Sequence, residues 1–344
     1  MRRRRAAVTR AVVAALTLSL GLTGCTAGSR TDVTLTTQPQ TGPTSPTVEP
    51  DRDRRLQIAV VTNGAPGDPF WDVVQTGADE AGTANDADVD YQSDPDPGGQ
   101  AQLIDAAISS DVDGLVVSLG DPDALRESVL RATAAGVPVV TINSGADRSA
   151  EFGALTHVGQ SDLGAGQGAG ERLREAGVTT LLCVIPQSGD PTLEERCRGA
   201  AEGFGTEGVD GAVISLPVNG ATLTEAETTI ATELQTTPAI DGILTLNAPL
   251  ASAASQAVQT AGSQATIATF ELDPDVVQAI RDGDLLFAVD QQQYLQGYLP
   301  VVFLALYART GTIAGAGQPV PTGPEYITRD NVDTVGNLAM TGTR

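Results

Sequence analysis

The sequence predicts an α/β fold in which two doubly wound parallel-sheet lobes are joined by a three-crossover hinge, with a ligand cleft between them. Two observations support this fold class. From Leu56 onward, short apolar runs alternate with helical patterns, and continuous apolar strands between helices of about 10–15 residues are typical of parallel sheets covered on both faces. The second observation is an internal repeat.

The repeat joins two pairs of segments at an offset of 128 residues. Val112-Asp-Gly-Leu-Val-Val matches Ile240-Asp-Gly-Ile-Leu-Thr, and Val137-Pro-Val-Val-Thr-Ile-Asn matches Ala265-Thr-Ile-Ala-Thr-Phe-Glu. Each pair begins or contains a β-rich apolar run. Two independent matches at one spacing indicate two lobes of similar construction.

The individual elements follow from local signals. The first lobe has Val/Ile/Leu-rich runs that we expect to be strands at 58–62, 114–117, 138–142 and 155–158. Helical patterns lie between and after them, one opened by Asp68-Pro69 and others at 99–109, 122–134 and 162–175; proline suits the first turn of a helix. The later strands, each followed by a helical pattern, are expected at 180–185, 211–215, 241–245, 266–270 and 286–290.

The N-terminal stretch is predicted to be an export signal rather than part of the fold. Five Arg and no acid precede an apolar run that ends in Leu-Thr-Gly-Cys25. The run is too short for the roughly 20 residues of a membrane span, and its end resembles a bacterial lipobox. Residues 1–24 are therefore expected to be a lipoprotein signal peptide, with Cys25 lipidated; a plain signal peptide with an incidental cysteine is the alternative.

Residues 25–55 are rich in Thr, Ser, Pro, Gln and Gly and almost free of apolar side chains. Such a segment cannot bury enough surface to fold, so we expect a disordered tether. The protein would then be exported and anchored by lipid to the outer face of the cytoplasmic membrane. The N-terminal lobe is expected at 56–160 plus 292–320, the C-terminal lobe at 161–291 plus 321–344, and the crossovers near 159–161, 290–293 and 318–322.

The charge balance excludes several function classes. The chain carries 43 Asp and Glu against 20 basic residues, all of them Arg, and its formal charge is −23. An acidic chain repels phosphate backbones, which disfavours nucleic acid as a partner. The single histidine, His157, leaves little room for His-based catalysis or a multi-histidine metal site. We expect no metal and no cofactor.

Candidate binding residues are found where strands end, because ligands of open parallel sheets bind outside the carboxyl ends of the strands. Their side chains are amides, hydroxyls and carboxylates, which form hydrogen bonds and are not nucleophiles. The residues at or just beyond strand ends are Asn63, Ser118, Asn143, Asn247 and Glu271.

Aromatic residues near the same ends favour a carbohydrate ligand. Phe70 and Trp71 open the first helix, and Phe270 ends a strand of the second lobe. A pocket with aromatic walls and a few polar contacts suits a polyol, whose C–H faces need planar partners. Because adjacent helical positions point about 100° apart, we expect one of Phe70 and Trp71 to be buried and the other to face the cleft.

Several other motifs are assigned structural roles. The G-x-G-x-x-A pattern at 164–169 lies inside a helical stretch, so close helix–sheet packing explains it better than dinucleotide binding. Residues 86–90 begin like a calcium loop but lack its glycine and its twelfth ligand, and we expect a solvated loop. The pairs Asp111/Asp113 and Asp282/Asp284 precede strands and are expected in turns. His157 is expected to be structural or close to the hinge.

Two cysteines follow the export signal. Cys183 lies in the run Leu-Leu-Cys-Val-Ile, and Cys197 lies in a helical segment next to Arg196. In an oxidising compartment a Cys183–Cys197 disulfide is plausible, and it would stiffen the segment that presents Arg196. Two buried free thiols are the alternative.

The region from Leu56 to the C-terminus resembles the ribose-binding-type, periplasmic binding protein type I, solute-binding proteins of ABC importers. The ordered motifs are IAVVTNGAPGDPFWDVVQTGADEAG, DGLVVSLGDPDAL, GVPVVTIN, VGQSDLGAGQGAGERL, EERCRGAAEGF, ASQAVQTAG and FELDPDVVQAIRDGDL. The closing FAVDQQQYLQGYLPV looks like an actinobacterial-style sugar-binding subgroup. The resemblance implies a monomer that captures a monosaccharide or cyclic polyol by hinge closure and delivers it to ABC permease subunits.

The resemblance also implies roles for single residues. The family's first-strand contact falls on Thr62 or Asn63, followed by a polar contact at Asp68 and stacking aromatics at Phe70 and Trp71. Its contacts in the second lobe fall on Arg196, Asn247, Glu271 and Gln291. The Asp-Arg pair of ribose binders falls on Asn143-Ser144, and an Asp falls on Glu271, so ribose is in doubt and another pentose, a hexose or a cyclic polyol is open. On this basis Arg196→Ala is expected to abolish sugar binding with the fold intact.

Other function classes are weaker. A transcription regulator of this fold would need a helix-turn-helix where the chain has an export signal. An enzyme would need a nucleophile or paired acids in the cleft, which offers only Asp68 and Glu271, so we do not expect an enzyme. A sugar sensor that signals to a membrane receptor kinase is the open alternative to import.

Overall fold

The computed structural model of the protein describes residues 54–205 and 213–344. Pro50–Arg344 form one compact unit. The expected signal peptide, Cys25, and the tether up to residue 53 lie outside the described residues.

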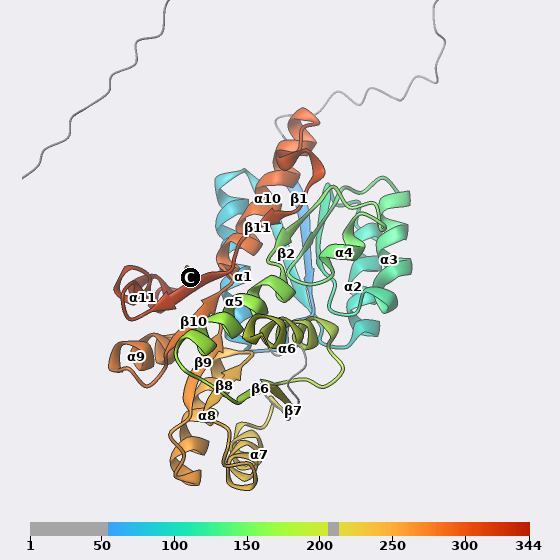
Figure 1. Ribbon diagram of the computed structural model, residues 1–344. Helices are drawn as coiled ribbons and strands as arrows, with labels where there is room; N and C mark the ends of the chain where they lie inside the picture. Colours follow the sequence, from blue (N-terminus) through green and yellow to red (C-terminus); the bar gives the residue numbers. More distant parts are fainter. Residues whose placement is uncertain (1–53, 206–212) are drawn as a thin grey trace, which may run out of the picture. The chain divides into compact units, whose positions relative to one another are not determined.

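The first sheet has six strands within the described chain, in the order β11-β5-β4-β3-β1-β2. Figure 1 labels β1, β2 and β11 of this sheet. All its pairs are parallel. Its strands are β1 (Leu56–Thr62), β2 (Ala87–Ser93), β3 (Gly114–Ser118), β4 (Val139–Ile142), β5 (Thr156–Gly159) and β11 (Val320–Pro321).

The second sheet repeats this plan, with the order β12-β10-β9-β8-β6-β7 among the described residues. Only the pairing of β12 with β10 is antiparallel there. Its strands are β6 (Leu181–Ile185), β7 (Val213–Pro217), β8 (Gly242–Thr245), β9 (Thr266–Phe270), β10 (Phe287–Asp290) and β12 (Glu325–Thr328). The repeated segments form β3 and β4 in one sheet and β8 and β9 in the other, so the predicted two-lobe α/β fold is confirmed.

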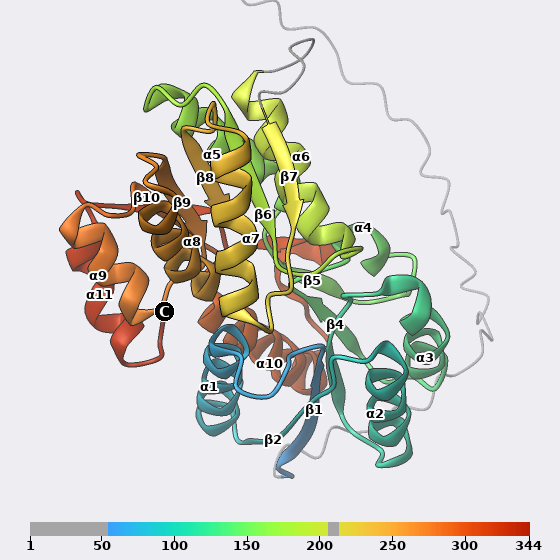
Figure 2. The ribbon, with the colours of Figure 1, turned by 90° about the horizontal axis from the view of Figure 1, so that it is seen from below.

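Helices cover both faces of each sheet (Figures 1 and 2). One face of the first sheet packs against α1 (Pro69–Ala84) and α10 (Gln293–Thr310), and the other against α2 (Pro97–Ser109) and α3 (Pro122–Ala134). The second sheet has α5 (Asp162–Glu175) and α6 (Pro191–Phe204) on one face. Its other face carries α7 (Leu223–Thr236), α8 (Ala248–Ala261), α9 (Pro274–Asp282) and α11 (Val332–Met340). The remaining short helices are α4 (Ala146–Ser149) and the 3₁₀ turn Ala314–Gly317.

The pleat of the strands sorts their side chains between these layers. In β3, Val116 packs toward α1 and α10, whereas its neighbours Leu115 and Val117 pack toward α2 and α3. In β6, Val184 and Cys183 likewise enter opposite layers. Because successive strand residues point to opposite faces, a strand buried on both sides must be apolar throughout, which explains the continuous runs in the sequence.

An Asp-Pro pair starts many of the helices that follow a strand. The aspartate side chain accepts a hydrogen bond from a first-turn N–H. Proline is tolerated at the first helical position because an N–H there would have no partner within the helix. The capping aspartates are Asp68, Asp96, Asp121, Asp190 and Asp273. Asn247 caps α8 in the same way, at 3.1 Å from the N–H of Leu250. This device places helix N-termini at the carboxyl ends of the strands.

Glycines set the distance between α5 and α6. A Cβ added at Gly166 would fall on the carbonyl oxygen of Arg196, and one at Gly199 would fall on that of Leu163. The G-x-G-x-x-A pattern is therefore a packing motif, as expected: Gly166 lies against α6, and Ala169 is buried in the layer between α5 and the second sheet. Gly77 of α1 and Gly297 of α10 provide the same close approach in the first lobe.

The expectation of a solvated loop at residues 86–90 is wrong. This segment belongs to β2, which pairs in parallel with β1 along its whole length. Ala87 is buried and Val89 packs on the core, while Asp88 and Asp90 are exposed. The alternation of small or apolar residues with acidic residues is typical of an edge strand that has one solvent-exposed face.

The described chain passes between the sheets three times. The first connection joins β5 to α5, and the second joins β10 to α10. The third was expected near 318–322, but β11 still pairs with β5 at residues 320–321, so the connection to β12 is made by residues 322–324.

Candidate functional site

A pocket of about 660 Å³ lies where the carboxyl ends of strands from both sheets meet. This volume lies within the usual range for small-molecule sites. The pocket is lined by most of the residues nominated from the sequence. They are Asn63, Asp68, Phe70, Trp71, Asn143, Arg196, Asn247, Glu271 and Gln291.

Two nominated residues lie behind the pocket wall. The Ser118 hydroxyl donates to Asn63 Oδ1 at 2.6 Å and accepts from the Asn63 N–H at 3.0 Å, so it fixes the orientation of a pocket amide. Phe270 is fully buried, and its ring lies 4.8 Å below the guanidinium of Arg196. Both residues support side chains that line the pocket and do not line it themselves.

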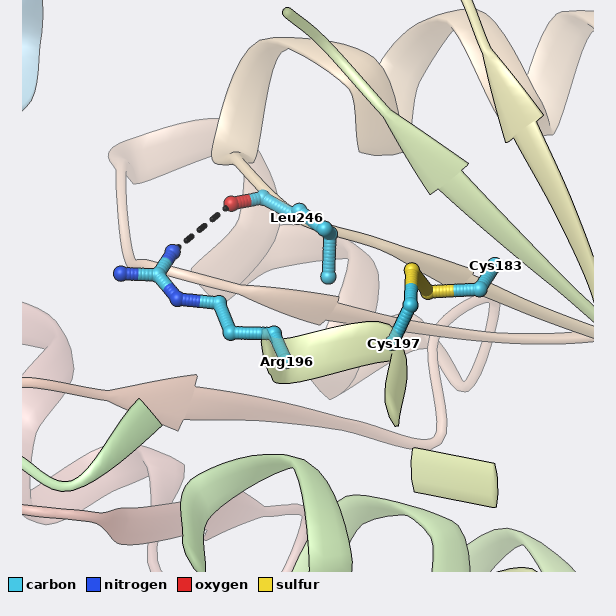
Figure 3. The surroundings of a disulfide bond; sticks show 4 residues. All are labelled: Cys183, Arg196, Cys197 and Leu246. Carbon is cyan, nitrogen blue, oxygen red and sulfur yellow. Dashed lines mark hydrogen bonds between the residues drawn. A yellow bond between two sulfur atoms is a disulfide. The ribbon is translucent and has the colours of Figure 1, made fainter. Parts of the chain in front are cut away.

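Arg196 is the central cation of the second-lobe wall. It comes from α6 and is held on several sides. Its Nε donates to Asp162 Oδ1 at 2.7 Å. Its Nη1 donates to the Leu246 carbonyl at 3.3 Å, the bond drawn in Figure 3. Its Nη2 donates to Gln291 Oε1 at 3.3 Å. Burial alone would lower the pKa of Arg196, but the nearby carboxylates, Asp162 first, raise it above its usual value, so the side chain stays charged.

Glu271 follows β9 in a left-handed conformation, with φ of 71°. Its carboxyl accepts long hydrogen bonds from the Ala248 N–H at 3.4 Å and from Gln291 Nε2 at 3.5 Å. Burial raises the pKa of Glu271 to about 8, although the charge of Arg196 opposes this rise. At neutral pH the group is therefore mostly a neutral acid that can both donate and accept a hydrogen bond.

The first-lobe wall contains two aromatic rings at the start of α1. Phe70 and Trp71 are 6% and 9% exposed, and their rings pack edge to face with centroids 5.1 Å apart. The expectation of one buried and one open ring is therefore wrong, because both rings are largely buried and both line the pocket. Gly64 makes this packing possible, since a Cβ there would lie 2.6 Å from the Trp71 ring.

Asn143 and Ser144 lie just beyond the end of β4, at the position where the family resemblance implies an Asp-Arg pair in ribose binders. Asn143 is also left-handed, with φ of 62°, and its Oδ1 accepts a hydrogen bond from the Ser144 hydroxyl at 2.9 Å. Both residues line the pocket. This corner is thus neutral and small, with hydrogen-bonding capacity in place of a charged pair.

Sequence reasoning missed part of the rim. The residues missed lie in the loops after β6 and β7 and in the first turns of α6 and α7, and they include Gln187, Asp190, Thr192, Leu193, Asn219 and Leu223. The signal that nominated the other residues, position after a strand end, applies to these loops as well. Asp190 was visible as part of an Asp-Pro pair, and it both caps α6 and lines the pocket.

Cys183 and Cys197 form a disulfide between β6 and the middle of α6, with their Cα atoms 5.8 Å apart (Figure 3). Cys183 points to the α6 face of the sheet because of the strand pleat. Since Cys197 directly follows Arg196, the bond ties the backbone that presents the guanidinium to β6, the strand next to the edge strand β7.

His157 lies in β5, away from the pocket lining. Its Nδ1 lies 2.9 Å from the Thr141 hydroxyl, and burial lowers its pKa to about 4. A neutral, buried imidazole at this position fits the structural role expected for it.

Within the described ranges, 54–205 and 213–344, no group of three or more His, Cys, Asp or Glu side chains is placed to hold a metal ion. The same part of the chain contains no helix that is both long and apolar enough to cross a membrane.

Comparisons with known proteins agree with this architecture. A family model described as periplasmic binding protein domain matches residues 58–312. The xylose/arabinose-binding protein XylF of Sulfolobus acidocaldarius is 27% identical over 248 residues, 67% of this chain and 60% of that protein. The chain therefore spans about three fifths of the length of this relative. The ribose import binding protein RbsB of Bacillus subtilis is 28% identical over 216 residues, covering 61% of this chain and 67% of that one.

Among solved structures, a carbohydrate transporter from Acidothermus cellulolyticus, crystallised in complex with myo-inositol, is 42% identical with a TM-score of 0.81. The similarity covers 85% of this chain and 100% of that one. A glucose-galactose binding protein from Geobacillus stearothermophilus, at 20% identity and a TM-score of 0.71, has the same fold. The chain belongs to the periplasmic binding protein family and has its type I fold.

Proposed function

We propose that this protein is an extracytoplasmic receptor that binds a neutral, polyhydroxylated ring, a cyclic polyol or a monosaccharide, and delivers it to an ABC import permease. The observation that carries the proposal is the convergence on one pocket of Trp71 and Asn63 from the first lobe with Arg196, Glu271 and Gln291 from the second. A ligand that contacts both walls stabilises the closed arrangement of the lobes, so binding and closure are linked.

The charges of the site favour a neutral ligand. The cation of Arg196 is already matched by Asp162 at 2.7 Å, so little positive charge remains to attract a phosphate or carboxylate. Burial also raises the pKa of Glu271 to about 8, which leaves a neutral acid at physiological pH. Amides, a neutral acid and a paired guanidinium provide donors and acceptors of the kind that ring hydroxyls need.

A cyclic polyol is the first ligand to test. The carbohydrate transporter from Acidothermus cellulolyticus, which is 42% identical, was crystallised with myo-inositol. The neutral Asn143-Ser144 corner removes a charged pair that ribose binders use, which supports a ligand other than ribose. Arabinose, xylose and ribose appear in the names of the relatives XylF and RbsB, so these sugars are the appropriate competitors.

The remaining features of the proposal concern location and partner. The N-terminal signal and Cys25 support export and a lipid anchor, and family membership supports delivery to a permease. We do not propose catalysis, because the pocket groups are placed as hydrogen-bonding partners and the relatives are described as binding proteins.

A thermal-shift panel on Pro50–Arg344 tests the proposal with myo-inositol, other inositols, pentoses, hexoses and linear alditols. A true ligand at about 100 times its dissociation constant adds about 2.7 kcal/mol to the free energy of unfolding and raises the melting temperature by a few degrees. A shift confined to ring polyols supports the proposal. Shifts with linear alditols alone, or no shift with any of these compounds, would contradict it.

A further inference from the structure

We propose that Gln296 is a positioning residue for the binding site, which holds the Asn143 side chain and the Gln291 main chain in place and so couples ligand contacts on the two lobes. This proposal rests on the proposed function, in which Asn143 and Gln291 contact the ligand. Gln296 lies in the first turns of α10, is fully buried, and does not line the pocket.

The hydrogen bonds of Gln296 reach three separate parts of the chain. Its Oε1 accepts from Asn143 Nδ2 at 3.1 Å, beyond the end of β4. Its Nε2 donates to the main-chain oxygen of Gln291 at 3.2 Å and to the Thr322 hydroxyl at 3.3 Å. Gln291 lies in the second connection between the sheets and Thr322 in the third. One amide therefore joins a first-lobe site residue to two of the connections about which the lobes would move.

The network continues from Gln291 into the second-lobe wall. The Gln291 side chain accepts from Arg196 Nη2 at 3.3 Å, and its Nε2 lies 3.5 Å from Glu271 Oε1. Polar contacts thus join Asn143 to Gln296 and Gln296 to the main chain of Gln291, and the Gln291 side chain in turn contacts Arg196 and Glu271. Buried polar networks of this kind specify one arrangement, because each member left without its partner carries a desolvation cost.

Another buried glutamine nearby, Gln293, shows that burial alone does not create this role. Gln293 is 1% exposed, and its Oε1 has no partner among the described residues. Gln296 differs because its amide oxygen and nitrogen are both engaged. Gln293, on the same helix, therefore serves as the matched control.

The Asn143 amide depends on Gln296 for its orientation. Asn143 Oδ1 is directed by the Ser144 hydroxyl at 2.9 Å, and Nδ2 by Gln296 at 3.1 Å. With methionine at position 296 the Nδ2 group loses its acceptor, and the amide is free to rotate away from the geometry that a ring hydroxyl meets. Loss of one such hydrogen bond from the bound state corresponds to roughly a tenfold change in dissociation constant.

The first experiment is a double-mutant cycle on Pro50–Arg344, with myo-inositol affinity measured by calorimetry. Gln296→Met is expected to weaken binding about tenfold, and Gln293→Met by less than twofold. Because Gln296 acts on Asn143 and also on Gln291, the loss of affinity in the double variant Gln296→Met/Asn143→Ala is expected to be smaller than the sum of the two single losses. Fully additive losses, or equal losses for the two methionine variants, would overturn the proposal.

The second experiment needs no ligand. In ¹⁵N-asparagine-labelled protein, the Asn143 side-chain amide signals are identified by their loss in Asn143→Ala. Gln296→Met is expected to shift them and speed their exchange with water, whereas Gln293→Met leaves them in place. Unchanged signals in Gln296→Met would overturn the positioning role.

The two experiments separate the two proposals. If the wild-type chain does not bind myo-inositol or any ring polyol, the proposed function fails, and the labelled-amide experiment still decides whether Gln296 holds Asn143. Should Gln296→Met not fold, Gln296→Asn replaces it in both measurements, because its amide is one methylene too short to reach Asn143.

Discussion

The guanidinium Nε of Arg196 lies 2.7 Å from the carboxylate of Asp162, and both side chains are almost completely removed from solvent, at 5% and 9% exposed. Asp162 is the first residue of α5 and Arg196 belongs to α6, so the pair joins the two helices at the edge of the pocket. Losing one member of a buried pair leaves the other charged and unpaired, which costs about 3–5 kcal/mol.

The consequence for Arg196→Ala differs from the expectation drawn from sequence. The variant should lose binding, because the guanidinium lines the pocket, and it should also lose about 3 kcal/mol or more of unfolding free energy. Denaturant unfolding and calorimetric titration measure the two effects. The double variant Arg196→Ala/Asp162→Asn should regain part of the stability and none of the binding; recovered binding would remove Arg196 from the site.

Stability should fall as the pH rises through the range set by Glu271. Burial raises the pKa of Glu271 from its ordinary value of 4.5 to about 8. Between these values the folded protein keeps a proton that the unfolded chain releases, so the free energy of unfolding decreases as pH increases across this window. It levels off above the folded pKa.

The Glu271→Gln variant is the control for this prediction. Its unfolding free energy, measured by urea titration from about pH 5 to about pH 8, should decline less than that of the wild type. The difference between the two curves isolates Glu271 from the other buried acids. Parallel curves for the two proteins would show that Glu271 does not titrate in this range.

The disulfide should support both stability and affinity. Cys183 and Cys197 are 14 residues apart, and closing a loop of this length is worth about 3 kcal/mol in the chain-entropy account. The variant Cys183→Ala/Cys197→Ala should unfold at lower temperature and bind more weakly, because Cys197 anchors the helix next to Arg196. Reducing agent should affect the wild type in the same direction and leave the variant unchanged; equal sensitivity of both would argue against the bond.

The contact between α5 and α6 predicts different effects on stability for alanine substitutions at two glycines of α5. Gly166→Ala places a methyl group on the Arg196 carbonyl, which forces the helices apart at the pocket, with an overpacking cost of about 1–3 kcal/mol. Gly164→Ala meets only the Ser161 side chain, at 3.2 Å. The gain in helix propensity of alanine over glycine, up to about 1 kcal/mol, should offset the cost of this close contact. The Gly164→Ala variant should therefore have nearly the wild-type stability. Similar melting temperatures for the two variants would contradict this packing.

Local signals explain why the fold could be predicted. The helices at 122–134 and 162–175 and the strand at 266–270 have the expected bounds, because Asp-Pro or Ser caps and continuous apolar runs mark their ends. Strands β2, β11 and β12 were not predicted. β2 is an edge strand rich in acids, β11 has two residues that pair with β5, and β12 pairs antiparallel with β10. Such segments become strands through neighbours far away in the sequence.

In the site, too, local sequence signals predicted some of the residues, whereas others depend on contacts between distant parts of the chain. Position after a strand end correctly placed Asn63, Asn143 and Asn247 at one pocket, because parallel strands deliver their carboxyl ends to one edge. Ser118 obeys the same rule but points at Asn63 instead of the cavity. The role of Gln296 depends on contacts with Asn143 and Thr322, 153 and 26 residues away, and no local pattern reports such contacts.

The most direct test of the central claim is a calorimetric titration of Pro50–Arg344 with myo-inositol, alongside inositol phosphate and ribose at the same concentrations. A receptor for a neutral ring polyol should bind myo-inositol one to one, bind ribose more weakly or undetectably, and not bind the phosphorylated ring, since Arg196 is already paired with Asp162. Binding of the phosphorylated compound with no binding of neutral sugars or polyols would contradict it.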